Sequence, residues 1–438
     1  MTIQNSAPVT GTDTGTGYGR PRPSHDARLT EVGPGTPMGE ALRRYWHPVA
    51  NSGALTSEVP HCTRVLGEDL IVFRDGAGRA GVVFERCAHR GSSLYYGRIE
   101  EDGIRCCYHG WKFDVQGHCL EQACEPGRGR RRDVARQPWY PVEERYGLVF
   151  VYMGPPERKP PLPRYDFFEE LEEGEAIYAE IPVPGQDVTG MFTDFNWLQG
   201  FENALDAVHP MWLHYHHSGP QFDMTGTPDG LPHSFFDPDT APAKIRYERT
   251  ERGAMTGQRF ERKEPDGTTA EVEMVVEVQV PTIIALPDTA WAHPGRRHDC
   301  LIWVVPSDDT TTRAFIVVRG KDIERVLHVV TGIRQNGKLY FELTEEEKQR
   351  FPGDFEAQGS QGPITLHSEE TLASADKGIV MLRRMLRQAV DDVEAGRDPQ
   401  NAHPDDNAPR STPAGFFDVS TKAAGALAEA GTAPSADS

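Results

Sequence analysis

Short apolar runs, each bounded by turn residues, dominate the first part of the chain. Residues 69–87, DLIVFRDGAGRAGVVFERC, alternate as a β-hairpin does. Residues 104–120, IRCCYHGWKFDVQGHCL, predict a second hairpin, and 146–154, YGLVFVYMG, a further strand. A proline-rich stretch at 155–166 follows, which we interpret as a linker between domains. The pattern therefore predicts an all-β N-terminal domain over 29–160.

The second part of the chain mixes two periodicities. Residues 193–217, TDFNWLQGFENALDAVHPMWLHYHH, predict a helical stretch, whereas 244–320 alternate as antiparallel strands do. Residues 376–399 carry an apolar stripe at helical spacing, formed by Ile379, Leu382, Leu386, Val390 and Val393. We therefore expect an α+β chain with a second domain at 161–400. The polar, Ala- and Gly-rich ends predict a disordered lead (1–28) and a flexible tail (401–438).

Composition narrows the class of protein. The 438 residues are 37% hydrophobic, and no run approaches the roughly 18 apolar residues of a membrane span. The N-terminus lacks the apolar segment of a secretory signal, which favours a cytoplasmic location. A net charge of -20 argues against nucleic acid or an anionic membrane as the main partner. Seven cysteines in so long a chain favour metal binding or catalysis over a disulfide framework.

Two short pairs of metal-ligand residues lie at the predicted hairpin tips. They are Cys87-x-His89 and Cys106-x2-His109, each followed by a glycine. A tetrahedral zinc ion and a Rieske [2Fe–2S] cluster both use two cysteines and two histidines. Zinc modules usually pair Cys with Cys and His with His, whereas here each hairpin supplies one of each. The pattern therefore favours the Rieske cluster, a one-electron relay.

A second set of candidate ligands is Asp206-x2-His209-x4-His214. Asp206 and His209, three residues apart, would share a helix face, so that Asp206 could orient the His209 ring. His209 and His214 would lie about 140° apart on a regular helix and converge only if the helix distorts or ends between them. Pro210 removes a backbone N–H at that point. Two imidazoles and a carboxylate from elsewhere make the facial triad of non-haem Fe(II) oxygenases.

The stretches VGPGTPMGEALRRYWHPV, NWLQGFENALDAVHP and SADKGIVMLRRML, together with both ligand motifs, resemble one known family. The chain resembles the oxygenase (α) subunits of Rieske non-haem iron ring-hydroxylating systems, in the phthalate dioxygenase-like branch, over residues 29–400. The resemblance implies a helix-grip catalytic domain, a curved antiparallel sheet around a long helix. It also implies Asp376 as the third ligand of a mononuclear Fe2+, with Glu369 and Glu370 as rivals. Locally, Asp376 could equally cap a helix.

The resemblance implies partners and a reaction as well. Asp206 would join His209 to His109 of a neighbouring subunit, which requires a homotrimer or a stacked hexamer. A separate NADH-dependent flavin/iron–sulfur reductase would supply electrons. O2 and a small aromatic substrate, an aryl carboxylate such as a phthalate or benzoate, would react. The alternatives are an aryl ether O-demethylase or monooxygenase of the same family, a Rieske electron-transfer protein without oxygenase activity, and a zinc-stabilised binding module.

Two groups of arginines are further candidates. Residues 127–133, GRGRRRD, form a basic loop that could dock an electron donor or lie in solvent. An aryl carboxylate would favour an arginine clamp in the pocket, for which the sequence offers Arg246, Arg249 and Arg259.

Overall fold

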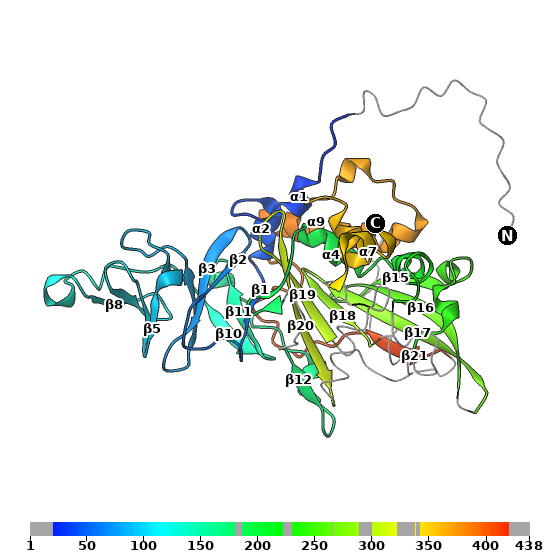
Figure 1. The fold of residues 1–438 in the computed structure, drawn as a ribbon, viewed down its shortest axis with the longest axis horizontal. Coiled ribbons are helices and arrows are strands. Elements are labelled where there is room, and N and C mark those ends of the chain that lie inside the picture. The colour runs from blue at the N-terminus through cyan, green and yellow to red at the C-terminus, as the bar shows by residue number, and fades with distance from the viewer. Residues whose placement is uncertain are drawn as a thin grey trace.

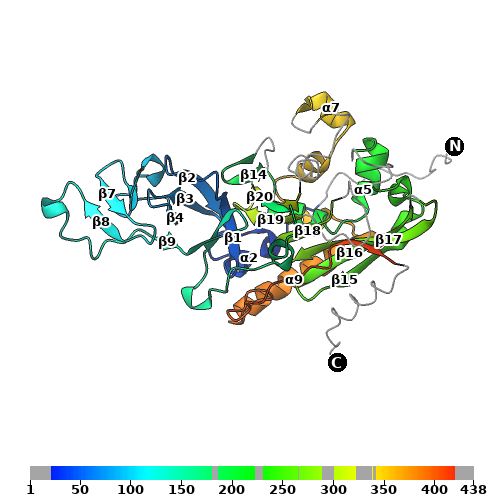
Figure 2. The same cartoon turned by 90° about the horizontal axis from the view of Figure 1, so that it is seen from below.

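The computed structural model of the chain describes residues 21–179, 186–221, 230–264, 266–288, 300–321, 338 and 342–419. Figure 1 shows a β-rich N-terminal part beside a larger part that is built on one broad sheet, and Figure 2 shows the same two parts from below. This arrangement confirms the expected α+β fold of two structural parts.

The N-terminal part consists of three small antiparallel sheets. Their strand orders are β1-β11-β10, β2-β3-β4-β9 and β5-β6-β7-β8. The predicted hairpins are present as the β3/β4 and β7/β8 pairs. The strands are β1 (Trp46–Asn51), β2 (His61–Val65), β3 (Glu68–Arg74), β4 (Ala80–Phe84), β5 (Arg98–Glu100), β6 (Gly103–Arg105), β7 (Trp111–Phe113), β8 (Cys119–Gln122), β9 (Trp139–Tyr140), β10 (Val142–Arg145) and β11 (Leu148–Tyr152).

The second part is built on an antiparallel sheet, ten-stranded within the described residues. Its main order is β13-β14-β20-β19-β18-β17-β16-β15, while β12 pairs with β20 and β21 with β17. Alternate side chains of β14 and of β16–β20 line a cavity. The strands are β12 (Ala176–Tyr178), β13 (Gln186–Asp187), β14 (Gly190–Thr193), β15 (Ile245–Arg249), β16 (Gly253–Lys263), β17 (Thr269–Gln279), β18 (Ile283–Leu286), β19 (Cys300–Pro306), β20 (Thr312–Gly320) and β21 (Gly415–Asp418).

The longest described helix, α9 (Lys377–Glu394), packs on β15 and β16, as expected for a sheet that wraps a C-terminal helix. Its buried face includes Leu382, Leu386 and Val390, three members of the predicted stripe. The other α-helices are α1 (Ala27–Thr30), α2 (Pro37–Leu42), α3 (Asp166–Glu169), α4 (Trp197–Asn203), α5 (His209–Met211), α7 (Glu345–Arg350) and α8 (Asp354–Gly359).

Short helical turns connect these elements. The one that matters most for the site is η4 (Trp212–His217), a π-helical turn that follows α5 directly. The remaining turns are 3-10 helices: η1 (Leu94–Tyr96), η2 (Pro126–Arg128), η3 (Pro156–Arg158), η5 (His233–Phe236), η6 (Ala241–Lys244), η8 (His367–Glu369) and η9 (Ser374–Asp376).

The two parts are joined by packing as well as by the linker. One apolar core runs through both, and Trp303 of β19 meets Phe150 of β11 with ring centroids 5.7 Å apart. The backbone N–H of Leu66 donates to the carbonyl of Pro306 at 2.9 Å. A second, smaller core surrounds Cys87 and Cys106 at the far end of the N-terminal part.

The C-terminal segment corrects one expectation from composition. Residues 401–419, predicted to begin a flexible tail, pack against the second part. Asn401 donates to the carbonyls of Arg252 and Val280, at 2.8 Å each, and Arg410 is buried. Strand β21 pairs with β17 and buries Phe416 completely. These backbone contacts hold the segment in place, and its polar composition gives no sign of them. Residues 1–20 and 420–438, the rest of the predicted lead and tail, lie outside the described residues.

None of the described helices combines the length and the apolar composition that crossing a bilayer requires.

Candidate metal centres and active site

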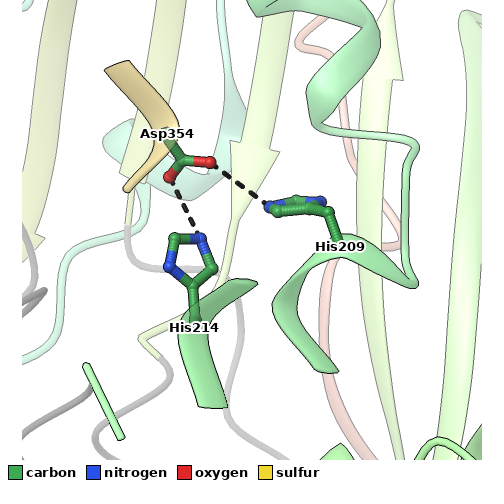
Figure 3. A group of neighbouring side chains, drawn as sticks. All are labelled: His209, His214 and Asp354. Atoms are coloured by element: carbon green, nitrogen blue, oxygen red, sulfur yellow. Dashed lines mark ion pairs between the residues drawn. The ribbon is translucent and has the colours of Figure 1, made fainter. Parts of the chain in front are cut away.

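Three side chains from two distant segments converge in the second part, as Figure 3 shows. His209 begins α5, His214 lies in η4 and Asp354 begins α8. Asp354 Oδ1 lies 3.5 Å from His209 Nε2, and its Oδ2 lies 3.2 Å from His214 Nε2. One ligand atom from each residue falls within 4.8 Å of the others, which a single ion could bridge.

A change of helix type between the two histidines explains how they can meet, because α5, which holds His209, ends at Met211 and His214 lies in the π-helical turn that follows. A π-helix bonds each residue to the fifth one along, so residues at this spacing approach the same face. The chain enters η4 from α5, whose first turn contains Pro210. The His209 and His214 rings stand 5.3 Å apart between centroids. The distortion expected from the sequence is therefore present, and π-bulges of this kind are frequent at functional sites.

Hydrogen bonds fix which nitrogen of each imidazole faces Asp354. His209 Nδ1 lies 2.5 Å from the carbonyl oxygen of Asp206, and His214 Nδ1 lies 2.5 Å from Gln221 Oε1. Both oxygens can only accept, so each Nδ1 carries the proton. Each Nε2 therefore faces Asp354 and is the nitrogen that would bind a metal. Asn203 adds a donor, because its Nδ2 lies 3.2 Å from Asp354 Oδ1.

The charges of the three side chains are strongly coupled. Burial alone would raise the pKa of Asp354, but the charges of His214 and His209 and a hydrogen bond from His214 hold it well below its ordinary value. Burial lowers the pKa of His209, whereas for His214 the attraction of Asp354 outweighs burial and raises the pKa. The site therefore keeps an ionised carboxylate beside two nitrogen ligands.

The second set of candidate ligands lies on two matched loops at the end of the N-terminal part. The N–H of Cys87 donates to the carbonyl of Ser92, and the N–H of Cys106 donates to that of Trp111, both at 2.8–2.9 Å. Gly91 and Gly110 donate back to the cysteine carbonyls with φ near 75° and 71°, a left-handed conformation that favours glycine. The two loops therefore present their cysteines in the same way.

The two loops face each other across a small space. Cys87 and Cys106 are both 3% exposed, and a hydrogen bond from Cys87 is the main cause that lowers the pKa of Cys106 to about 5. His89 and His109 stand 4.6 Å apart between ring centroids and are only half-buried. The sulfur atoms thus lie on the protein side and the imidazoles on the solvent side. His89 also stacks on Trp111, at 4.3 Å.

A cavity of about 380 Å³ opens beside the His209–His214–Asp354 group. Its walls come from alternate residues of β14 and β16–β20, together with η5 and α8. Most of these residues are apolar, and no lysine or arginine lies among the described residues that line the cavity. Such a space suits an aromatic ligand of one or two rings.

The chain is similar to known proteins over both of its parts. Residues 45–136 match the family model of the Rieske [2Fe–2S] domain. The phenoxybenzoate dioxygenase subunit alpha of Ectopseudomonas oleovorans is 46% identical over 387 residues, 87% of this chain and 88% of that protein. This chain belongs to the Rieske non-haem iron oxygenases, as an oxygenase subunit. The phthalate 4,5-dioxygenase oxygenase subunit of Pseudomonas putida is 30% identical over 85% of this chain and 87% of its own length.

Solved structures show the same fold for this Rieske oxygenase. NdmA of Pseudomonas putida CBB5 with caffeine aligns with a TM-score of 0.58 at 19% identity, over 84% of this chain and 95% of that chain. Membership of the family rules against the zinc-stabilised module and the electron carrier without oxygen chemistry.

The family's two cofactors, a Rieske [2Fe–2S] cluster and a mononuclear non-haem iron, fit the residues present. Two buried thiols opposite two imidazoles match a cluster whose one iron takes sulfur and whose other iron takes nitrogen. Two imidazole nitrogens and one carboxylate match a facial triad with open positions.

The structure of this Rieske oxygenase does not bring Asp376 to the two histidines, which corrects the expected third ligand. Asp376 Oδ2 instead accepts from the N–H of Ala373 at 2.5 Å at the start of α9, the capping role that its local sequence also allowed. The preceding carbonyl, of Ala375, accepts from the Tyr247 hydroxyl. Of the named rivals, Glu370 pairs with Arg383. Asp354 lies beside the two histidines instead. Sequence reasoning missed it because it is one of 66 acidic residues and its segment carries no ligand motif.

Asp206 contacts His209 through a different group from the one expected. A single helix over 193–217 would have placed its carboxylate beside the His209 ring. The structure instead ends α4 at Asn203, and Asp206 Oδ1 accepts from the N–H groups of Val208 and His209 at 3.2 Å each. Its carbonyl, not its carboxylate, therefore contacts the His209 ring.

The candidate arginine clamp lies away from the cavity. Arg246 pairs with Glu273 at 2.6 Å and with Glu248 at 2.6 Å. Neither Arg259 nor Arg249 lines the cavity. Burial lowers the pKa of His89, and Glu125, two residues before the basic loop, is near enough to that imidazole to oppose the shift.

Proposed function

We propose that Cys87, His89, Cys106 and His109 hold the Rieske cluster and that a facial triad of His209, His214 and Asp354 holds the mononuclear iron. The observation that carries the second assignment is the convergence of the three side chains with both Nε2 lone pairs directed at one carboxylate. When bound, the cluster supplies single electrons and the iron supplies oxygen activation. The chain's own residues orient the ligands and keep bulk water from the apolar cavity.

The proposed substrate is an aryl carboxylate of one or two rings. A volume of about 380 Å³ exceeds what a single ring needs, and the apolar wall would bury ring faces. The relative with 46% identity is named for phenoxybenzoate, a two-ring carboxylate. The described wall offers no cation, so the carboxylate would have to be bound outside that wall.

Product analysis tests this proposal. The purified chain would be incubated with a donor reductase, NADH and a panel of phenoxybenzoates, phthalates, benzoates and aryl methyl ethers. We expect O2-dependent oxidation of an aryl carboxylate, with a two-ring substrate preferred. Formaldehyde release would indicate the O-demethylase alternative instead. Absence of O2-dependent product from every carboxylate, in enzyme with full iron and sulfide content, would overturn the substrate proposal.

Asp206 is proposed to connect the two metal centres between neighbouring subunits. Its Oδ1 is used by the local turn, whereas no hydrogen bond is recorded for its Oδ2 among the described residues, which leaves an acceptor for His109 of a second copy. This arrangement requires a homotrimer or a hexamer. Asp206→Asn should retain both metals and the oligomer but lose most turnover. Normal turnover in that variant would exclude the connection.

A separate NADH-dependent flavin/iron–sulfur reductase is the proposed electron donor, and the loop at 127–133 is its proposed docking point. The loop begins two residues after Glu125, which influences the pKa of His89, and its arginines would attract an acidic partner. Arg130→Glu combined with Arg131→Glu should slow reduction of the cluster and weaken its dependence on salt. Unchanged reduction kinetics at low and high salt would place docking elsewhere.

A further inference from the structure

Gln221 connects the two segments that carry the proposed iron ligands. It is completely buried, and its side-chain amide forms hydrogen bonds to both segments. Its Oε1 lies 2.5 Å from His214 Nδ1, and its Nε2 donates to the carbonyl of Pro352 at 3.1 Å. Pro352 lies two residues before Asp354. A single amide therefore touches the histidine of one segment and the backbone beside the carboxylate of the other.

The surrounding bonds make this position rigid. The backbone N–H of Gln221 donates to the carbonyl of His214 at 3.0 Å, which closes the chain back on η4. Ser218 Oγ donates to the same Pro352 carbonyl at 2.7 Å. Gln221 does not line the cavity, so it does not touch a bound substrate.

We propose that Gln221 is a positioning residue that prepares the iron site in two ways. Its amide oxygen holds the proton of His214 on Nδ1, so that Nε2 presents a lone pair toward Asp354. Its amide nitrogen, through the hydrogen bond to Pro352, fixes the position of the Asp354 segment relative to His214 Nε2. Side chains that fix a ligating histidine in this way typically contribute about 10- to 100-fold to metal affinity. This inference rests on the proposed ligands His209, His214 and Asp354.

Gln199 provides a matched control. It is also a buried glutamine, and its Nε2 donates to the carbonyl of Gln358 at 2.8 Å and to that of Gly362 at 3.1 Å. It therefore ties α4 to the end of the same helix that Asp354 begins, but contacts none of the three ligands. A purely structural role for a buried glutamine would affect both positions alike.

The experiment uses the full chain with its Rieske cluster, stripped of mononuclear iron by a chelator and titrated anaerobically with Fe2+. Gln221→Met should weaken Fe2+ binding by about 10- to 100-fold, while Gln199→Met should stay within about threefold of the wild type. Gln221→Glu retains an accepting oxygen for His214 but loses the donor to Pro352, so it should recover only part of the affinity. The visible absorption of the cluster serves as an internal control for folding.

The possible outcomes separate the claims. Wild-type affinity in Gln221→Met, or an equal loss in Gln199→Met, would overturn the positioning role. A loss in Gln221→Glu as large as in Gln221→Met would show that the accepting oxygen is not what matters, and would overturn it too. Full Fe2+ binding by His214→Ala would instead show that the ligands themselves are wrongly assigned.

Discussion

A buried ion-pair group beneath the iron site gives a sharp test of the packing. Arg383 of α9 holds Glu202 of α4 with bonds of 2.5 and 2.7 Å and Glu370 with bonds of 2.6 and 2.8 Å. The side chains of Arg383 and Glu202 are only 8% and 11% exposed. Glu202 precedes Asn203, which donates to Asp354. The group therefore fixes the helix that supports the site.

Arg383→Met would leave Glu202 buried without its cation. Burial already raises the pKa of Glu202, so the variant would protonate it rather than bury a bare charge. Protonating a carboxyl whose unfolded pKa is about 4.3 costs about 3.7 kcal/mol at pH 7 and about 1.6 kcal/mol at pH 5.5. Glu370, at 20% exposure, can remain charged in contact with water. We expect a loss of about 3–5 kcal/mol at pH 7, the usual cost of breaking a buried pair.

The same protonation of Glu202 determines how the stability of the variant changes with pH. In the variant, the folded-state pKa of Glu202 lies above its unfolded value, so the folded state binds the extra proton and loses stability as the pH rises. Urea unfolding of the second part, followed by circular dichroism, should show a loss about 2 kcal/mol smaller at pH 5.5 than at pH 7. The double variant Glu202→Gln with Arg383→Met should recover most of it. A loss under about 1 kcal/mol at pH 7, or one independent of pH, would refute this account.

Three further outcomes are expected. Asp354→Ala should lower the affinity for mononuclear iron by about tenfold or more, whereas Asp376→Ala should not. Iron content measured relative to the visible absorption of the cluster tests this, and the opposite result would favour Asp376 as the ligand. Burial holds the pKa of His47 at about 4, below its ordinary value of 6.5, so stability rises with pH across that window. Wild type should therefore lose about 2 kcal/mol between pH 7 and pH 5 that His47→Gln does not lose; equal pH dependence in urea unfolding would contradict this. Thr256 Oγ1 is buried without a hydrogen-bond partner among the described residues, so Thr256→Val should keep or raise the unfolding free energy by about 1 kcal/mol; a clear fall in thermal midpoint would reveal a bond to that hydroxyl.

The parts of the molecule that the sequence predicts are those whose cause is local. The two loops of the cluster site depend on ligands two or three residues apart and on Gly91 and Gly110, all within one short stretch. The stripe of α9 is likewise a local periodicity. Regular helix geometry keeps His209 and His214 apart, so the sequence predicts that they meet only where the helix is interrupted. The π-helical turn η4 is that interruption.

Local sequence could not identify the proposed third ligand, because Asp376 and Asp354 have equally suitable local surroundings. Asp376 and Asp354 each stand at the start of a helix, where a carboxylate is favoured by the helix dipole. Tertiary contacts separate them. The segment before Asp354 is bonded to Ser218 and Gln221, next to His214 in space, whereas the segment before Asp376 is bonded to Tyr247 of β15. The proposed ligand Asp354 is therefore brought to the histidines by residues that contact the start of its helix, and those residues lie more than a hundred positions away along the chain.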